Sequence, residues 1–305
     1  PYAGDTWSRL ETLLDGYADG WADMYGDACE ATHLRGEQSE AVLDLRMACL
    51  DRRRDGLGAL VTLLTDEMDP ELLDRAVSAA YDLDPLTPCA DVEALAATVP
   101  PPEDPDVRRE VERLRGELDR AAALERTGRF TEGAEIAAGV VDQSRGLDYP
   151  PIHAEAHYRL GMLQDKTGEY ARAEANLQAA AKAAAEARDD DLIAASLIAE
   201  VVVVGDRQAR TDEGLALVRA AEVALARAGG DPVHRAQLLH NHGNVQLVRG
   251  QLGEAAAGRK TAKAALLATS RQTTSSGGMG AQARVFEARA LRALAECAAL
   301  QSPAS

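Results

Sequence analysis

The chain has 305 residues, a formal net charge of −17 and only 4% aromatic residues. This length suits one elongated repeat domain or two compact domains, and the abundant alanine favours closely packed helices over a β-sheet. The acidity is concentrated in residues 1–105, which carry a net charge of −16, while residues 106–305 carry −1. Because no basic face is visible, we do not expect the chain to bind nucleic acid. The acidic third is either solvated helix surface or a docking site for a basic partner.

The acidic third is expected to be an N-terminal helical cap domain, residues 1–105. Its apolar pattern predicts two long amphipathic helices, a third helix and a short fourth one, over residues 5–33, 39–66, 70–83 and 91–97. Ser39 is the expected N-cap of the second helix. Proline and aspartate in "VPPPEDPD" at 99–106 then end one helix and begin the next. The segment closest to a β-strand in composition is "AEVVVV" at 199–204.

Four similar stretches follow one another in the rest of the chain: residues 123–141, 162–180, 205–223 and 245–263. Each begins with helix, reaches a turn and starts a second helix. The turn residues are Gly128, Gly168, Ala209 and Gly250, spaced 40, 41 and 41 residues apart. Small residues lie on both sides of the turns: Ala121, Gly161 and Gly243 before, and Gly133, Ala173, Gly214 and Ala255 after. The third repeat departs from this pattern, with Val202 at the position before its turn.

This pattern resembles the tetratricopeptide repeat, in which small residues allow two helices to cross closely and an aromatic side chain follows the turn. The aromatic position holds Phe130 and Tyr170 in the first two repeats, but Thr211 and Leu252 in the last two. We therefore predict an all-α chain: an α-solenoid of about four long, 40–41-residue helical hairpins over residues 106–268, preceded by the helical cap. A flexible break at 269–280 and a capping helix and tail at 281–305 are expected to follow.

The block "ACEATHLRGEQSEAVLDLRMACL" and the segment up to "VPPPEDPDVR" resemble the non-kinase region of large membrane serine/threonine protein kinases of myxobacterial type. The resemblance implies a non-catalytic sensor or scaffold segment that binds a protein or peptide, cut from a longer protein. The chain carries none of the kinase motifs, so it is not expected to be an enzyme itself. A free-standing cytoplasmic tetratricopeptide adaptor and an enzyme with an unrecognised site are the alternatives.

The chain is expected to be a soluble fragment that does not insert into a membrane, because it has no run of 18 or more apolar residues and no signal peptide. Its place in a suspected membrane protein is extracytoplasmic or, alternatively, cytoplasmic. The cysteines bear on this choice, because disulfides persist in oxidising compartments and free thiols in the cytoplasm.

A disulfide between Cys29 and Cys49 is not expected. In a hairpin that turns near residues 34–38, Cys29 lies about 6 Å and Cys49 about 15 Å from the turn, at about 1.5 Å per residue. The helix predicted at 70–83 runs back along its predecessor, and "LTPC" then brings Cys89 close to the level of Cys49. Cys49–Cys89 is therefore the first choice for a bridge, and four buried free thiols are the alternative.

No metal or cofactor site is predicted. His153 and His157 are four residues apart, but no third ligand is evident beside them. The segment "GEAAAGRKT" at 253–261 misses the phosphate-loop pattern by one inserted arginine, and it lies within a predicted helix instead of a turn.

The resemblance to tetratricopeptide arrays implies that the first helix of each hairpin lines a concave groove. The residues expected there are Arg126, Tyr158, Arg159, Lys166, Arg207, His240, Asn241 and Asn244. Asn241 and Asn244 are similar to the asparagines that hold an extended peptide backbone in peptide-binding members, where an amide offers both a donor and an acceptor. The alternative is a solvated concave surface without a ligand.

Overall fold

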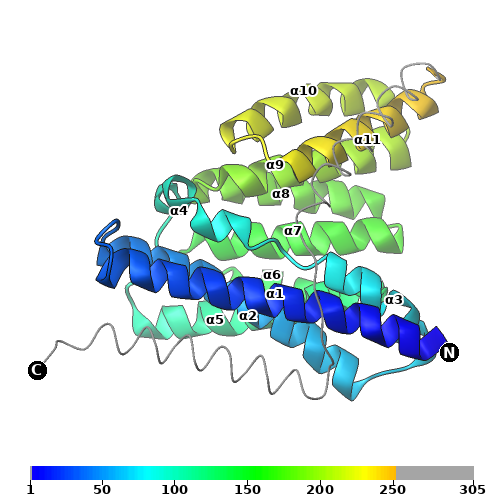
Figure 1. Ribbon diagram of the computed structural model, residues 1–305. Coiled ribbons are helices and arrows are strands. Elements are labelled where there is room, and N and C mark those ends of the chain that lie inside the picture. The colour runs from blue at the N-terminus through cyan, green and yellow to red at the C-terminus, as the bar shows by residue number, and fades with distance from the viewer. Residues whose placement is uncertain (1, 252–305) are drawn as a thin grey trace, which may run out of the picture. The chain divides into compact units, whose positions relative to one another are not determined.

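The computed structural model describes residues 2–251, and every regular element in this range is helical (Figure 1). These residues form two compact units, one of residues 2–97 with 122–128 and one of residues 98–121 with 129–251. The expected second helix of the fourth hairpin, the break at 269–280 and the capping helix at 281–300 lie outside the described residues.

The first unit is built on two long antiparallel helices. Its elements are α1 (Tyr2–His33), α2 (Glu40–Asp66), α3 (Pro70–Tyr81), the 3₁₀-helix η1 (Thr87–Ala90) and α4 (Val92–Ala97). Ser39 caps α2 as predicted, because its side chain accepts a hydrogen bond from the Val42 amide. The helix α3 ends two residues earlier than predicted, and η1 was not anticipated. Leucines of α1 and α2 form the core with one face of α3.

The second unit consists of helices joined by short turns. They are α5 (Pro105–Arg126, as far as Ala121), α6 (Phe130–Ser144), α7 (Pro150–Thr167), α8 (Tyr170–Ala187), α9 (Asp190–Glu200), the π-helix η2 (Val201–Arg207), α10 (Thr211–Arg227) and α11 (Pro232–Val248). From α7 to α11 the helices follow one another as successive layers (Figure 1). The strand-like "VVVV" segment is thus the first part of a π-helix.

The four predicted turn residues share one backbone conformation. The φ angles of Gly128, Gly168, Ala209 and Gly250 are 86°, 83°, 56° and 85°. Positive φ reverses the chain after a helix at little cost for glycine, whereas the Cβ of alanine crowds the backbone there. The spacing of 40–41 residues therefore repeats a structural unit as well as a sequence pattern.

Exchanging the residue types at two of these turns should change stability in opposite directions. We expect Ala209→Gly to raise the free energy of unfolding and Gly168→Ala to lower it, each by about 0.5–1 kcal/mol. No atom lies within 4 Å of a Cβ built on Gly168, so its replacement tests backbone strain alone. Urea denaturation of both variants measures the two changes, and a loss of stability in Ala209→Gly would contradict the assignment of this turn.

Small residues meet where the helices of a hairpin cross, but the third hairpin uses a residue that the sequence pattern did not indicate. A Cβ on Gly133 would lie 3.1 Å from the Ala121 carbonyl oxygen. In the third hairpin, Gly214 meets Gly205 instead of Val202, since a Cβ on Gly214 would lie 2.5 Å from the Gly205 Cα. Gly205 belongs to the π-helix, whose wider turn changes which residue faces α10.

Candidate functional site

Two of the residues expected on the inner face, Lys166 and Arg207, lie together with Asp165 between α7 and η2. The Arg207 Nε donates to the Asp165 Oδ1 at 3.1 Å, and the Lys166 Nζ lies 3.4 Å from the other oxygen of the same carboxylate. The Asp165 side chain is only 8% exposed, whereas those of Lys166 and Arg207 are 38% and 39% exposed. The two cations are thus held near the surface by one largely buried carboxylate.

Two further predicted residues lie on α7 and contribute to packing. Tyr158 is half-buried against a cluster of Ala173, Leu177 and Val203. Arg159 is also half-buried. The ring of Tyr158 therefore joins α7 to α8 and η2, and its first role is to hold these helices together.

Asn241, which was predicted to hold a ligand backbone, makes a contact within the chain. Its Nδ2 donates to the Ile198 carbonyl oxygen at 3.0 Å, so one of the two amide N–H donors is used there. Ile198 lies three residues before the π-helix, where the helical hydrogen bonding changes, and its carbonyl accepts this side-chain bond from α11. Asn241 thus has a structural role at this junction.

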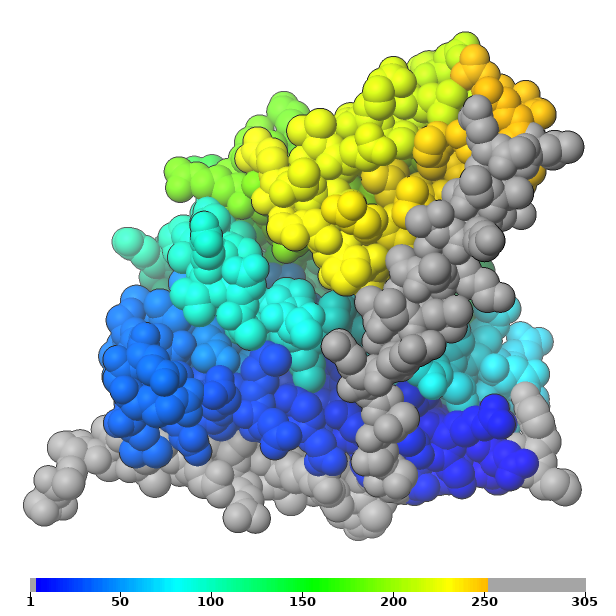
Figure 2. Space-filling view, turned by 45° about the horizontal axis from the view of Figure 1, so that its top comes forward, coloured from blue at the N-terminus to red at the C-terminus, as the bar shows by residue number. Residues whose placement is uncertain are grey.

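Asn244 and His240 lie one turn apart on α11, with 3.5 Å between the Asn244 Nδ2 and the His240 Nε2. His240 is exposed and Asn244 is half-buried. The helices α10 and α11, yellow-green to orange in Figure 2, reach the surface of the second unit on the face drawn there. This pair places an imidazole and an amide side by side on α11.

Arg126, which was also predicted on the inner face, makes contacts with other residues of the first unit. Its Nε donates to the Asp82 carbonyl oxygen at 2.9 Å, and an Nη lies 3.2 Å from the Asp84 carboxylate. The side chain is 8% exposed. Helical counting placed Arg126 correctly on a helix face, but only the fold showed that its partners come from the segment after α3.

Sequence reasoning missed a charged network that joins α8, the turn between η2 and α10, and the start of α10. Arg210 donates to Glu174 at 2.7 Å and to Glu213 at 2.8 Å, while Gln208 donates to Glu174 at 2.9 Å. Nearby, Gln178 donates to the carboxylate of Glu200 at 2.8 Å. Only the spacing of Arg210 and Glu213, three residues apart, was visible in the sequence.

Glu200 should make stability depend on pH. It is 4% exposed, and burial raises its pKa in the folded protein. The folded state then binds this proton more tightly than the unfolded state does. The free energy of unfolding therefore falls as the pH rises through the two pKa values. Glu200→Gln should remove this loss and raise the free energy of unfolding at pH 7.

Urea denaturation between pH 4 and pH 7 measures this effect. Glu213→Gln is the control, and its effect on stability should have the opposite sign. A hydrogen bond from Arg210 lowers the pKa of Glu213. That carboxylate contributes stability above its unfolded-state pKa and loses it as the pH falls. If Glu200→Gln destabilised the protein at pH 7, the buried carboxylate would be a net stabilising group and the prediction would be wrong.

The two candidate histidines have separate partners. His153 lies 2.8 Å from the Leu147 carbonyl oxygen, and the His157 Nδ1 lies 2.7 Å from the Asn176 Oδ1. Within residues 2–251, no group of three or more His, Cys, Asp or Glu side chains is arranged to hold a metal ion. The segment at 253–261 lies outside the described residues.

An open groove of about 480 Å³ lies between α10 and α11. Its lining combines two apolar side chains, Leu215 and Val218, with polar and charged ones: Arg219, Glu222, His242, Gln246, Arg249 and Gln251. None of the residues predicted for ligand binding lines it.

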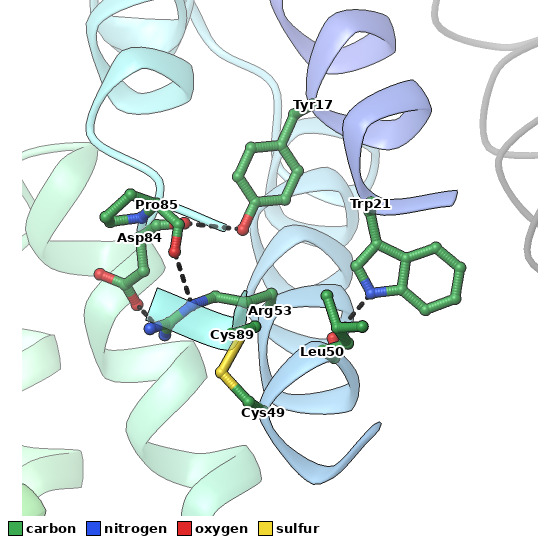
Figure 3. The surroundings of a disulfide bond; sticks show 8 residues. All are labelled: Tyr17, Trp21, Cys49, Leu50, Arg53, Asp84, Pro85 and Cys89. Atoms are coloured by element: carbon green, nitrogen blue, oxygen red, sulfur yellow. Dashed lines mark hydrogen bonds and ion pairs between the residues drawn. A yellow bond between two sulfur atoms is a disulfide. The ribbon is translucent and has the colours of Figure 1, made fainter. Parts of the chain in front are cut away.

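A disulfide bond joins Cys49 of α2 to Cys89 of η1, with 5.4 Å between their Cα atoms (Figure 3). This is the pairing that the sequence placed first. Polar side chains hold the neighbouring segment: the Tyr17 hydroxyl donates to the Asp84 carbonyl at 2.8 Å, and the Arg53 Nε donates to the Pro85 carbonyl at 2.9 Å. Burial raises the pKa of Tyr17, which keeps the phenol protonated as a donor.

The chain matches no protein-family model, no curated protein and no solved structure. Among the described helices, none combines the length and the apolar character that crossing a membrane requires.

Proposed function

We propose that the second unit is a tetratricopeptide-like α-solenoid, and that the chain is a non-catalytic module that binds a protein or peptide. The observation that carries this proposal is the repeated turn: four residues at a spacing of 40–41 all have positive φ. Stacked hairpins of this kind bury a continuous core and present the first helix of each hairpin on one face. Exposed polar side chains on that face suit recognition of an extended or helical peptide.

The binding surface consists of Lys166, Arg207, His240 and Asn244, which belong to α7, η2 and α11. The two cations attract an acidic group of the ligand, which competes with Asp165 for them. Asn244 and His240 supply hydrogen bonds to the ligand. Asn241 is left out of this surface, because its amide bonds to Ile198.

The chain is further proposed to be the regulatory region of a membrane-bound bacterial Ser/Thr protein kinase, on the basis of the resemblance in the "ACEATHLRGEQSE" block. The Cys49–Cys89 disulfide supports an extracytoplasmic position for this region, because disulfides persist in oxidising compartments. The reading frame upstream of residue 1 separates this proposal from a free-standing adaptor, since only the former predicts a kinase domain and a membrane helix there.

Charge reversal tests the binding surface. Peptides that bind the full chain are first selected from a random display library, and isothermal titration calorimetry then measures their affinity for variants. The double variant Lys166→Glu/Arg207→Glu should weaken an acidic peptide at least about tenfold, and Asn244→Ala should weaken it severalfold.

The matched control reverses the charges of Arg145 and Arg172, which lie at the end of α6 and the start of α8 and have highly exposed side chains. This control changes the net charge by the same amount, so it should leave the affinity near that of the parent. Selected peptides that bind all variants as tightly as the parent would show that this surface is not the binding site.

A further inference from the structure

The segment that follows Pro85 has few apolar contacts to hold it. Cys89 is the buried residue of η1, and all 6 residues of α4 are partly or fully exposed. Leu86 adds one partly buried side chain, which lies 3.3 Å from the position of a Cβ on Gly20. We call residues 87–97, which comprise η1 and α4, the strap.

Polar contacts fix the residues that precede the strap. Arg126, Tyr17 and Arg53 bind the carbonyl groups of Asp82, Asp84 and Pro85, in that order (Figure 3). The strap itself lies against α2, and its covalent attachment there is the disulfide between Cys89 and Cys49. Cys89 also packs in a buried cluster with Trp21 and Leu50, and the disulfide is the covalent anchor of η1 and α4 that a reductant can break.

We propose that the Cys49–Cys89 disulfide is a redox-controlled latch, whose reduction releases the strap from α2 while the helical core of the first unit stays folded. The proposal does not depend on the binding function of the second unit. The reductant is a dithiol, either a small molecule or an exposed Cys pair of an oxidoreductase. Reduction supplies two electrons to the disulfide, and the dithiol becomes a disulfide in turn.

Exposure decides which sulfur is attacked. Cys49 is half-buried, whereas Cys89 is fully buried, so the thiolate of the reductant attacks the Cys49 Sγ. The bond between the cysteines breaks, and Cys89 leaves as a thiolate that takes up a proton. The second thiol of the reductant then displaces Cys49, which also becomes a thiol. Arg53 lies one turn after Cys49 on α2, and its guanidinium binds the Pro85 carbonyl and lies 3.7 Å from the Asp84 carboxylate (Figure 3).

Contacts other than the disulfide stabilise the core of the first unit. Leu10, Leu57, Leu60 and Leu64 of α1 and α2 pack with α3 in a cluster that does not include the cysteines. Trp21 is fully buried, and its Nε1 donates to the Leu50 carbonyl at 2.7 Å. Trp21 also packs with Cys89 in a second cluster, so release of the strap opens one side of that cluster. The leucine cluster and the bond between Trp21 and Leu50 do not involve the strap and stay in place, and the freed residues gain conformational entropy.

Hydrogen–deuterium exchange of the full chain tests the latch. Oxidised protein is compared with protein treated with dithiothreitol and with the variant Cys49→Ser/Cys89→Ser. Peptides that cover the strap should exchange at least about tenfold faster in both treated and variant protein, while peptides that cover residues 57–64 keep their protection. Differential alkylation before mass spectrometry identifies which cysteines the reductant has opened.

The double variant also isolates this disulfide from Cys29. Dithiothreitol added to the variant should cause no further change in the strap, because the latch is already absent. Unchanged exchange of the strap after reduction of Cys49 and Cys89 would overturn the proposal. Loss of protection throughout α1 and α2 would overturn it too, because the disulfide would then stabilise the whole unit instead of holding one segment.

Discussion

Replacing Gly214 by alanine is expected to destabilise the second unit by about 3 kcal/mol or more, at the upper end of the range for overpacked cores. The new Cβ would lie 2.5 Å from the Cα of Gly205, which is a backbone atom and has no rotamer to change. Gly205 has little space to shift, because a Cβ built on it would lie 2.5 Å from the Val245 Cγ2 of α11. The hairpin can relieve the overlap only by moving α10 away from η2.

Substitutions at two other glycines provide comparisons for the loss of stability expected at Gly214. Gly161→Leu should cost about 1–3 kcal/mol or more, because a Cβ on Gly161 would lie 2.9 Å from the Leu177 Cγ and 3.2 Å from the Ala173 carbonyl oxygen. Gly116→Ala on α5 has no atom within 4 Å of the new Cβ. It should therefore raise the free energy of unfolding by about 0.5–1 kcal/mol through helix propensity alone. Urea denaturation measures all three variants, and equal effects at Gly214 and Gly116 would refute the close crossing.

The second large effect is expected at the ion pair between Arg115 of α5 and Glu155 of α7. The guanidinium donates two hydrogen bonds to the carboxylate, at 2.8 Å and 3.0 Å, and lies 5.7 Å from the centroid of the Tyr149 ring. The two side chains are only 20% and 16% exposed. Burial opposes the charged form of Arg115, but Glu155 outweighs this and raises the pKa of the guanidinium.

Removing one member of this pair leaves the other charge without compensation in a poorly hydrated position. Glu155→Gln should therefore cost about 2–3 kcal/mol, somewhat less than a fully buried pair would. The double variant Arg115→Met/Glu155→Leu removes both charges while keeping apolar volume, and it should stay within about 1 kcal/mol of the parent.

A double-mutant cycle by urea denaturation yields the coupling energy between the two side chains. The control is Asp142→Asn, which breaks the exposed pair of Asp142 and Arg145 at the end of α6. Solvent screens that pair, so the control should change stability very little. If Glu155→Gln were as mild as the control, solvent would reach the α5–α7 pair more than its burial indicates.

Local chemistry determined the parts of the structure that the sequence predicted well. Helical periodicity and capping depend on neighbouring residues, so α2 was placed to within one residue at its start, with Ser39 as its cap. The turns at Gly128, Gly168 and Gly250 could be read because only glycine adopts positive φ without strain. The repeat spacing then indicated Ala209 as the fourth turn, although alanine does not favour this conformation.

The Cys49–Cys89 pairing could also be derived, because helix rise and an antiparallel return decide which cysteines reach the same level. The roles of individual polar side chains could not. A face of a helix can be counted from the sequence, but the group that it meets comes from a distant segment. Asn241 bonds to Ile198 and Arg126 to Asp82 and Asp84, and helical counting could not predict these partners.

The π-helix is the clearest case of a feature that only the tertiary structure decided. The four valines from Val201 to Val204 give no local signal for a wider turn, and their composition is closer to that of a strand. Contacts with distant segments of the chain determine which residues of the π-helix face α10 and α11. Gly205 meets Gly214 and Val245, and Asn241 of α11 bonds to the Ile198 carbonyl. Because these partners lie 9 to 43 residues away along the chain, the sequence predicts the hairpin while packing selects which glycine forms its crossing.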